Sequence, residues 1–324
     1  MNFTNPHIIL VTGASGFIGS ALLPKLLSDK FEVRILGKCS ASHYIRGIKQ
    51  FDKGRLDSST FLDEPLQGVR TVIHLAARVH VMNDSCCESL EAYKRDNLEI
   101  TMNLARQAAS AGVRRFIFMS TIKVNGEYTA EGTKFHADDN PNPQDPYSIS
   151  KFQAEMALRV LSDDTGMELV IIRPPLVYGP RVKANFHNMM KLLYKVPILP
   201  FGAIRNSRSF VSLNNLVDLI SICVTHPNAA NQIFLVSDDY DVSTSDLFKL
   251  ISNALGKKIR LISIPSFLIK AIFSLIGKKH FYFRLFESLQ VDITKTTKLL
   301  GWYPPHSFNT EINLTVQEFT RNKL

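Results

Sequence analysis

The stretch HIILVTGASGFIGSALLPKLL, residues 7–27, decides the fold of this chain. A short apolar run, typical of a buried strand, leads directly into a segment with three glycines, Gly13, Gly16 and Gly19, and apolar residues at helical spacing follow. Glycines between a strand and a helix allow a tight turn and let the backbone approach a diphosphate at the helix N-terminus. The stretch therefore predicts a dinucleotide-binding turn. The residues that we expect to contact the cofactor here are Gly13, Ser15, Gly16, Phe17, Ile18 and Gly19.

Strand and helix patterns alternate over the first half of the chain. Apolar runs at residues 31–36, 71–77, 114–120 and 168–174 are typical of strands, and helical patterns lie at about 88–110 and 146–164. This alternation predicts an α/β fold, a Rossmann-type doubly wound parallel sheet. Beyond residue 174, proline and glycine become frequent. We expect an NAD(P)-binding domain at 1–174 and a smaller α/β substrate-binding part at 175–324, with elements that cross between the two.

Composition and charge restrict the function classes. The 324 residues are 45% hydrophobic and 21% charged, as in ordinary soluble globular proteins. The net charge of +9 comes without a long basic run, which favours an anionic small substrate over a nucleic acid. The N-terminus enters a strand almost at once and leaves no room for a signal peptide, so we expect a cytoplasmic protein. The four cysteines, which show no metal-binding spacing and are expected to be reduced, are Cys39, Cys86, Cys87 and Cys223.

One segment, LISIPSFLIKAIFSLIG at 261–277, is apolar enough to compare with a membrane span. It is slightly short and contains Pro265 and Lys270, so a buried or surface-lying helix is the favoured interpretation. Lysine and arginine residues flank it on both sides, so association with an anionic membrane surface is the less favoured alternative.

The segment PYSISK places Tyr147 and Lys151 four residues apart in a predicted helix, on one face and one turn from each other. A tyrosine hydroxyl, with an ordinary pKa of about 10, is a poor acid or base at neutral pH. A neighbouring ammonium group favours the phenolate, so we expect Lys151 to lower the pKa of Tyr147. The pair predicts acid–base chemistry beside a dinucleotide.

Taken in order, these motifs resemble the extended short-chain dehydrogenase/reductase family, in its nucleotide-sugar epimerase, dehydratase and reductase branch. The resemblance covers nearly the whole chain. The matching segments are TGASGFIGS at 12–20, GRLD at 54–57, HLAA at 74–77, DNLEITMNLARQA at 96–108, ST at 120–121, PYSISK at 146–151, RPPLVYGP at 173–180, RSFVSLNNLVD at 208–218 and LLGWYPP at 299–305.

The resemblance implies a role for several residues. Thr121 would hydrogen-bond the C4 oxygen of a sugar beside Tyr147, and Lys151 would also bind the cofactor ribose. On the cofactor side it implies contacts from Asp57 at the adenine and from Leu75, Ala76 and Ala77 near the diphosphate. For the diphosphate of a UDP-sugar substrate it implies Asn185, Arg208 and Arg284. It also implies a homodimer. For His74 and Asn97 we expect structural hydrogen bonds, and for Trp302 a packing role.

The residues after the strand at 114–120 limit the chemistry. Sugar 4,6-dehydratases of this family carry Thr-Asp-Glu at this position, whereas this chain has Thr121, Ile122 and Lys123. Without the acid pair, hydride transfer at C4 remains, with Thr121, Tyr147 and Lys151 as the catalytic residues. The segments STIKVNGE at 120–127, RPPLVYGPRVKANF at 173–186 and ESLQVDITKT at 287–296 resemble reductases of bacterial surface-polysaccharide pathways. The resemblance therefore favours a 4-ketoreductase acting on a UDP-4-keto-6-deoxy-N-acetylhexosamine in surface polysaccharide (lipopolysaccharide) biosynthesis. The alternatives are a UDP-hexose or UDP-N-acetylhexosamine 4-epimerase with bound NAD and, disfavoured because all three residues are present, a non-catalytic Rossmann-type binding protein.

The end of the strand at 31–36 bears on cofactor choice. NAD-using members carry an acidic residue there that binds the adenosine ribose. In this chain the position is Gly37, with Lys38 after it and Arg34 earlier on the same strand. We expect Arg34 and Lys38 to bind a 2′-phosphate, and therefore a preference for NADP(H), with NAD(H) as the alternative cofactor.

Overall fold

The computed structural model describes residues 7–38, 47–78, 86–265, 267–269, 283 and 285–321. Its centre is one seven-stranded sheet in which every strand pair is parallel. The strands, in the order in which they lie side by side, are β10 (Gln232–Leu235), β6 (Glu168–Arg173), β5 (Arg115–Met119), β4 (Thr71–His74), β1 (Ile8–Thr12), β2 (Glu32–Gly37) and β3 (Lys49–Asp52).

This strand order confirms the predicted doubly wound fold. From β1 the chain builds outward through β2 and β3 on one side and then through β4, β5 and β6 on the other. The order therefore reverses between β1 and β4, and ligands of such sheets bind outside the carboxyl ends of the strands at that point. The sequence patterns predicted β1, β2, β4, β5 and β6 but missed β3, whose four residues KQFD carry no long apolar run.

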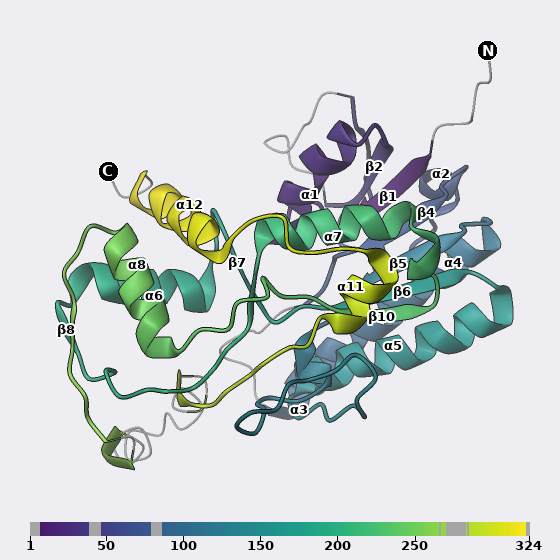
Figure 1. Ribbon diagram of the computed structural model, residues 1–324. Coiled ribbons are helices and arrows are strands. Elements are labelled where there is room, and N and C mark those ends of the chain that lie inside the picture. The colour runs from purple at the N-terminus through teal and green to yellow at the C-terminus, as the bar shows by residue number, and fades with distance from the viewer. Residues whose placement is uncertain are drawn as a thin grey trace.

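Helices cover both faces of the sheet (Figure 1). The α1 helix packs against α7 on one face, and α4 packs against α5 on the other. The helices of this region are α1 (Phe17–Ser28), α2 (Asp63–Leu66), α3 (Cys86–Lys94), the π-helical η2 (Arg95–Glu99), α4 (Ile100–Ser110), the 3-10 turn η3 (Ile122–Val124), α5 (Pro146–Thr165), α7 (Leu213–Thr225), the 3-10 turn η4 (Pro227–Ala229) and α11 (Thr294–Leu300). The helix predicted at 146–164 is thus present as α5.

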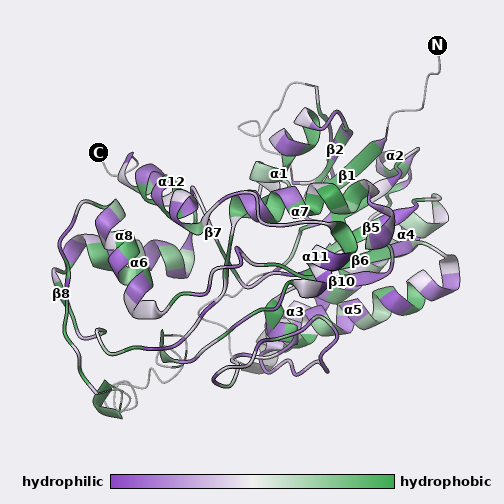
Figure 2. Cartoon of the chain, in the orientation of Figure 1, coloured by the Kyte–Doolittle hydropathy of each residue, from purple (hydrophilic) through white to green (hydrophobic). Residues whose placement is uncertain are grey.

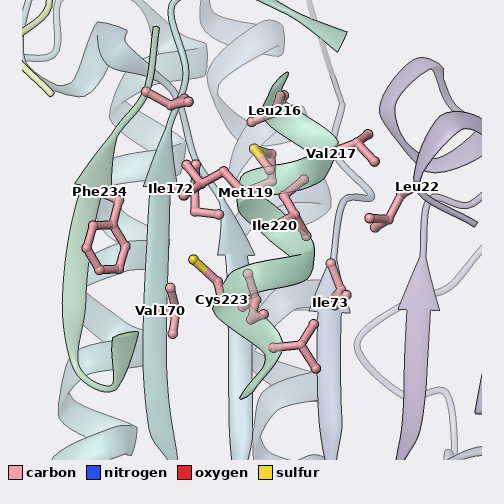
Figure 3. Close-up of a cluster of buried hydrophobic side chains, with 14 of the residues drawn as sticks. Leu22, Ile73, Met119, Val170, Ile172, Leu216, Val217, Ile220, Cys223 and Phe234 are labelled. Carbon is pink, nitrogen blue, oxygen red and sulfur yellow. The ribbon is translucent and has the colours of Figure 1, made fainter. Parts of the chain in front are cut away.

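Alternate residues of the central strands face opposite helical layers, so the sheet is buried on both sides. Ile9 belongs to the apolar cluster under α1 and α7, whereas its neighbour Leu10 belongs to the cluster under α4 and α5. Figure 3 shows the first cluster, in which Cys223 of α7 points towards Val170 of β6 and Ile220 lies on the side of α7 nearer Ile73 of β4. The hydropathy colouring agrees, because α5 alternates between hydrophobic and hydrophilic residues as a helix with one buried face must (Figure 2).

Elements from beyond residue 174 contribute to two parts of the molecule. The helices α7, η4 and α11 and the strand β10 complete the sheet layer. The remaining elements surround a third apolar cluster beside the sheet (Figure 1). These elements are β7 (Leu176–Tyr178) paired with β9 (Phe210–Ser212), β8 (Ile198–Leu199) paired with β11 (Arg260–Leu261), α6 (Ala184–Lys195), α8 (Thr244–Ala254) and α12 (Phe308–Arg321).

Most of the apolar segment at 261–277 lies outside the described residues. Its first residue ends β11, and residues 266 and 270–277 are among those not described. In the part of the chain that the structure describes, no helix is long and apolar enough to cross a membrane.

The packing of the glycine turn yields a first prediction. A Cβ at Gly19 would lie 2.3 Å from the Gly13 carbonyl oxygen and 2.6 Å from the Ala14 Cα, whereas a Cβ at Gly16 would lie 3.1 Å from the same oxygen. Gly19→Ala should therefore lower the free energy of unfolding by about 1–3 kcal/mol, as overpacking does. The matched control Gly16→Ala should lose less than about 1 kcal/mol. Urea unfolding measures both, and equal losses would contradict the packing argument.

Candidate active site

The glycine turn places the N-terminus of α1 at the carboxyl end of β1. Gly13 has φ +70°, and Gly16 is the N-cap of α1, so no side chain caps the first amide groups. The first turn of α1 carries no acidic residue, and Ser15 and Gly16 are exposed. Free amide groups at a helix N-terminus, without a competing carboxylate, suit a diphosphate. The turn therefore fits the dinucleotide that the sequence predicts.

The residues after β4 lie directly against this turn. A Cβ at Gly13 would approach the Ala76 nitrogen to 2.6 Å, so the two backbones are in contact. The Leu75 amide donates to the Thr12 carbonyl oxygen at 3.2 Å, and the Ala76 amide lies 3.4 Å from the Thr12 hydroxyl oxygen. Leu75, Ala76 and Ala77 are half-buried. The structure thus brings this predicted group together with the glycine turn.

His74 and Asn97 support this edge through structural hydrogen bonds, as predicted. The two ring nitrogens of His74 contact the hydroxyls of Thr12 at 2.6 Å and Thr101 at 2.8 Å. Burial, with a contribution from the charge of Lys151, lowers the pKa of His74 to about 3, so the ring is neutral at physiological pH. Asn97, on η2, accepts from the amide of Arg78 and donates to the hydroxyl of Ser150 on α5.

The helix that carries Tyr147 and Lys151 begins at a capping box. Asp145 is the N-cap of α5 and accepts from the Ser148 amide at 2.6 Å, while the Ser148 hydroxyl lies 3.1 Å from the Asp145 amide. Tyr147 is half-buried, and its ring meets that of Tyr93 edge to face with centroids 6.1 Å apart. One turn further on, Lys151 is 1% exposed.

The expected effect of Lys151 on Tyr147 is not the dominant one in this protein. Burial, and then the charge of Asp145, raises the pKa of Tyr147. Burial lowers the pKa of Lys151 to about 7, against a smaller opposite effect of Glu155. The ammonium group lies 4.0 Å from the centroid of the Phe118 ring. The sequence argument considered only the mutual charge effect, whereas desolvation of both groups outweighs it here.

A buried ion pair, which the sequence analysis missed, connects α5 to the sheet. Arg173, at the end of β6, donates to both carboxylate oxygens of Glu155 at 2.9 and 2.5 Å, and both side chains are 1% exposed. The Ser120 hydroxyl donates to the same carboxylate at 2.5 Å, and Arg173 also donates to Asn125 at 2.9 Å. A signal was available in the sequence, because Glu155 follows Lys151 by four residues and so continues the face that carries Tyr147.

The end of β5 places Thr121 and Lys123 near the start of α5. Thr121 is buried, with 9% of its surface exposed, and is the N-cap of η3. Ile122 is 3% exposed and belongs to the core. Lys123, at the position where a dehydratase would carry its glutamate, forms ion pairs with Asp145 at 2.6 Å and Glu127 at 2.9 Å. The two positions after Thr121 therefore carry no carboxylic acid side chain.

The three residues predicted for the adenosine side have different surroundings. Arg34 donates to the carbonyl oxygens of Gln67 at 2.7 Å and Pro65 at 3.5 Å, in the segment that leads into the amino end of β4. Its guanidinium group is thus held towards the amino edge of the sheet, and we remove Arg34 from the cofactor contacts. Lys38 is exposed at the carboxyl end of β2, after Gly37 with φ +128°. Asp57 is exposed and accepts from Ser59 and Thr60, which lowers the pKa of its carboxyl group.

The residues predicted for the substrate lie in the part beside the sheet. Asn185 is exposed in the first turn of α6. Arg208 precedes β9 and donates to the carbonyl oxygen of Glu287 at 2.8 Å. Arg284 lies outside the described residues. Trp302 is 3% exposed and donates to Asp218 at 3.0 Å, which confirms its packing role.

The buried Lys151 yields a prediction about stability. Its pKa is about 7 in the folded chain against 10.5 ordinarily, so between these values the unfolded chain binds a proton that the folded chain does not. Stability of the cofactor-free protein should therefore rise with pH across this window. Lys151→Met removes the buried charge and should raise Tm at pH 7, with a gain that shrinks towards about pH 10.

Thermal unfolding of wild type and variant across this pH range measures the difference. The matched control is Lys53→Met, which removes an exposed lysine and should show no such pH-dependent gain. A lower Tm for Lys151→Met at every pH would show that the lysine stabilises the empty fold.

Comparison with known proteins adds to this geometry. The model of the NAD dependent epimerase/dehydratase family matches residues 9–237. The chain is 45% identical over 318 residues to a UDP-glucose 4-epimerase of Vibrio cholerae, covering 97% of this chain and 96% of that protein. It is 28% identical over 337 residues to an N-acetyl-α-D-glucosaminyl-diphospho-ditrans,octacis-undecaprenol 4-epimerase of Escherichia coli O157:H7, covering 98% of this chain and 97% of that protein.

A solved structure shares the fold. The UDP-glucuronic acid 4-epimerase of Bacillus cereus, in complex with NAD, superposes with a TM-score of 0.77 at 21% identity, covering 97% of this chain and 99% of that one. The doubly wound sheet is therefore common to both chains. Because the family model matches more than half of the sequence and the Vibrio cholerae relative matches nearly all of it, the chain belongs to the NAD dependent epimerase/dehydratase family of nucleotide-sugar enzymes.

Proposed function

We propose that this protein is a UDP-hexose 4-epimerase with NAD(H) as its resident cofactor. The observation that carries the proposal is the 45% identity, over nearly the full length of both chains, to a UDP-glucose 4-epimerase. The strand end after β5 supports it, because Ile122 is in the core and Lys123 is held by Asp145 and Glu127. Elimination at C5 and C6 would need acids at these two positions.

The residues proposed for the chemistry are Thr121, Tyr147 and Lys151. Tyr147 removes the proton of the C4 hydroxyl. After the bound ketosugar has rotated to present its other face, Tyr147 returns this proton to the C4 oxygen. Thr121 donates a hydrogen bond to the same oxygen. Lys151 holds positive charge beside the phenolate and binds the cofactor ribose. The glycine turn and Lys151 would hold NAD, which would supply the reversible hydride chemistry at C4.

The remaining sites follow the division of the molecule. The proposed cofactor contacts are the glycine turn and first turn of α1 (Gly13, Ser15, Gly16, Phe17, Ile18, Gly19) with Asp57, Leu75, Ala76, Ala77, Tyr147 and Lys151, and Lys38 joins them only for a cofactor with a 2′-phosphate. Residues 175–324, apart from α7, η4, β10 and α11, are the proposed substrate-binding part, in which Asn185, Arg208 and Arg284 bind the diphosphate of UDP. A homodimer is also proposed, because Met156 and Val160 are apolar side chains exposed one turn apart on α5.

A 4-ketoreductase of a UDP-4-keto-6-deoxy-N-acetylhexosamine is the second candidate, and the end of β2 favours it. Gly37 provides no carboxylate to repel a 2′-phosphate, and the exposed Lys38 follows. Support for NADP(H) is weaker than the sequence indicated, because Arg34 is held by Pro65 and Gln67. The two candidates share their catalytic residues and differ in whether the cofactor leaves after each turnover.

The test of activity uses the substrate itself. Purified protein with UDP-glucose, and separately with UDP-N-acetylglucosamine, should form the C4 epimer, as followed by proton NMR without added cofactor. Tyr147→Phe should reduce kcat by at least about a hundredfold, because acid–base groups typically contribute 10²–10⁴-fold. The matched control Tyr128→Phe changes an exposed tyrosine and should leave kcat unchanged. A Tyr147→Phe variant that kept more than about a tenth of the activity would remove Tyr147 from this role.

The cofactor separates the two candidates. An epimerase that regenerates NAD in each cycle should be purified with it, so mass spectrometry of the denatured protein should find NAD near one equivalent per chain. Lys38→Ala should not change this content, since NAD has no 2′-phosphate. An empty protein that consumes NADPH only with the 4-ketosugar would instead establish the reductase.

A further inference from the structure

Lys123 connects the two elements that carry the proposed catalytic residues. It lies in η3, two residues after Thr121, and its ammonium group reaches the carboxylate of Asp145, two residues before Tyr147, at 2.6 Å. Lys123 and Asp145 are partly buried, with side chains 23% and 21% exposed. An ion pair with this burial and distance is less screened than a fully exposed one.

Asp145 serves the helix and the ion pair with different oxygens. Its Oδ1 accepts the Ser148 amide at 2.6 Å, and its Oδ2 accepts from Lys123 at 2.6 Å. A negative charge at a helix N-cap stabilises the helix, but this one also lies beside Tyr147 and raises its pKa. The charge of Asp145 therefore stabilises the start of α5 but opposes the ionisation of Tyr147, unless a cation offsets the carboxylate.

The other described groups around Tyr147 include aromatic, cationic and acidic side chains. From α3, Tyr93 packs against its ring and also raises its pKa, and from α5 the buried Lys151 lies one turn away with a pKa of about 7. The loop after η3 brings Glu127, a second carboxylate, to within 2.9 Å of Lys123. Among the contacts of the described residues, the Lys123 ammonium group thus bridges both acids.

We propose that Lys123 is a positioning residue for the C4 chemistry, because its ammonium group neutralises Asp145 at the helix start and so allows Tyr147 to release its proton. The inference rests on the proposed function of Tyr147 as the base. The backbone contributes too, since the Lys123 amide lies 3.4 Å from the Thr121 hydroxyl oxygen and orients it. Lys123 therefore acts through Tyr147 and Thr121 and need not touch the sugar.

The first measurement is the pH profile of kcat for the epimerisation. In Lys123→Met, Asp145 loses its counter-charge, so the rise of kcat with pH should move to higher pH. For each protein, kcat near pH 6.5 is divided by kcat at its high-pH plateau. This ratio should be about three- to tenfold lower in the variant than in wild type, the size expected for one partly buried charge. Lys123→Arg keeps the charge and should retain the wild-type profile.

A second variant distinguishes this electrostatic role from a mechanical link. Asp145→Asn keeps a good N-cap residue while removing the negative charge. If charge is what matters, Lys123→Met with Asp145→Asn should recover at least half of the pH shift of Lys123→Met alone. If the ion pair only ties η3 to α5, the double variant should be no better than the single one, and the proposal would fail. Should Lys123→Met not fold, Asp145→Asn alone must move the profile to lower pH.

A readout independent of turnover separates this inference from the proposed function. Tyrosine labelled with ¹³C at Cζ reports ionisation by NMR in the NAD-loaded protein, and Tyr147→Phe identifies the resonance. Tyr147 should titrate at higher pH in Lys123→Met than in wild type and return towards wild type in the double variant. Wild-type protein that converts no UDP-hexose would refute the epimerase alone, whereas coincident titrations in all variants would overturn the role of Lys123.

Discussion

The ion pair between Glu155 and Arg173 is the interaction on which the geometry of the site depends. It joins the middle of α5 to the end of β6, and Ser120 and Asn125 complete its hydrogen bonds. Tyr147 and Lys151 lie on the same face of α5 as Glu155, so their distance from the sheet edge follows from this contact. Loss of one partner would leave a buried charge uncompensated, which typically costs about 3–5 kcal/mol. The pair therefore fixes the position of α5, and with it Tyr147 and Lys151, against the sheet.

Burial determines the protonation states of Tyr147 and Lys151 in the ligand-free protein. Burial keeps Tyr147 protonated and lowers the pKa of Lys151 to about 7. If a dinucleotide binds as proposed, its hydroxyl groups would reach Lys151 and water would be excluded, so the protonation states during turnover would be those of the complex. The spacing of Tyr147 and Lys151 in the sequence identifies the pair but does not predict the pKa of either side chain.

Local patterns predicted five strands of the sheet, the glycine turn and α5, because each depends on residues that are close in sequence. The strands β3 and β10 were missed; the four residues of β3 show no strand pattern, and the strand is stabilised by its pairing with β2. Arg34 was assigned from strand alternation, which predicts the face of a side chain but not the carbonyl groups that a long arginine reaches. The sequence places Glu155 on the face of Tyr147, but its pairing with Arg173, 18 residues away, and that of Lys123 with Asp145, 22 residues away, follow from the folded chain and not from local patterns.

Gly37 has a consequence for how this protein can change during evolution. A Cβ at this position would meet no atom within 4 Å, so space does not exclude a larger residue. Its φ of +128° does, because L-amino acids rarely adopt this conformation. A single codon change to aspartate would thus introduce the ribose-binding carboxylate only together with a strained backbone. The end of β2 would have to change its backbone conformation before a carboxylate at this position could reach an adenosine ribose without strain, so a single substitution of Gly37 is disfavoured whichever cofactor binds.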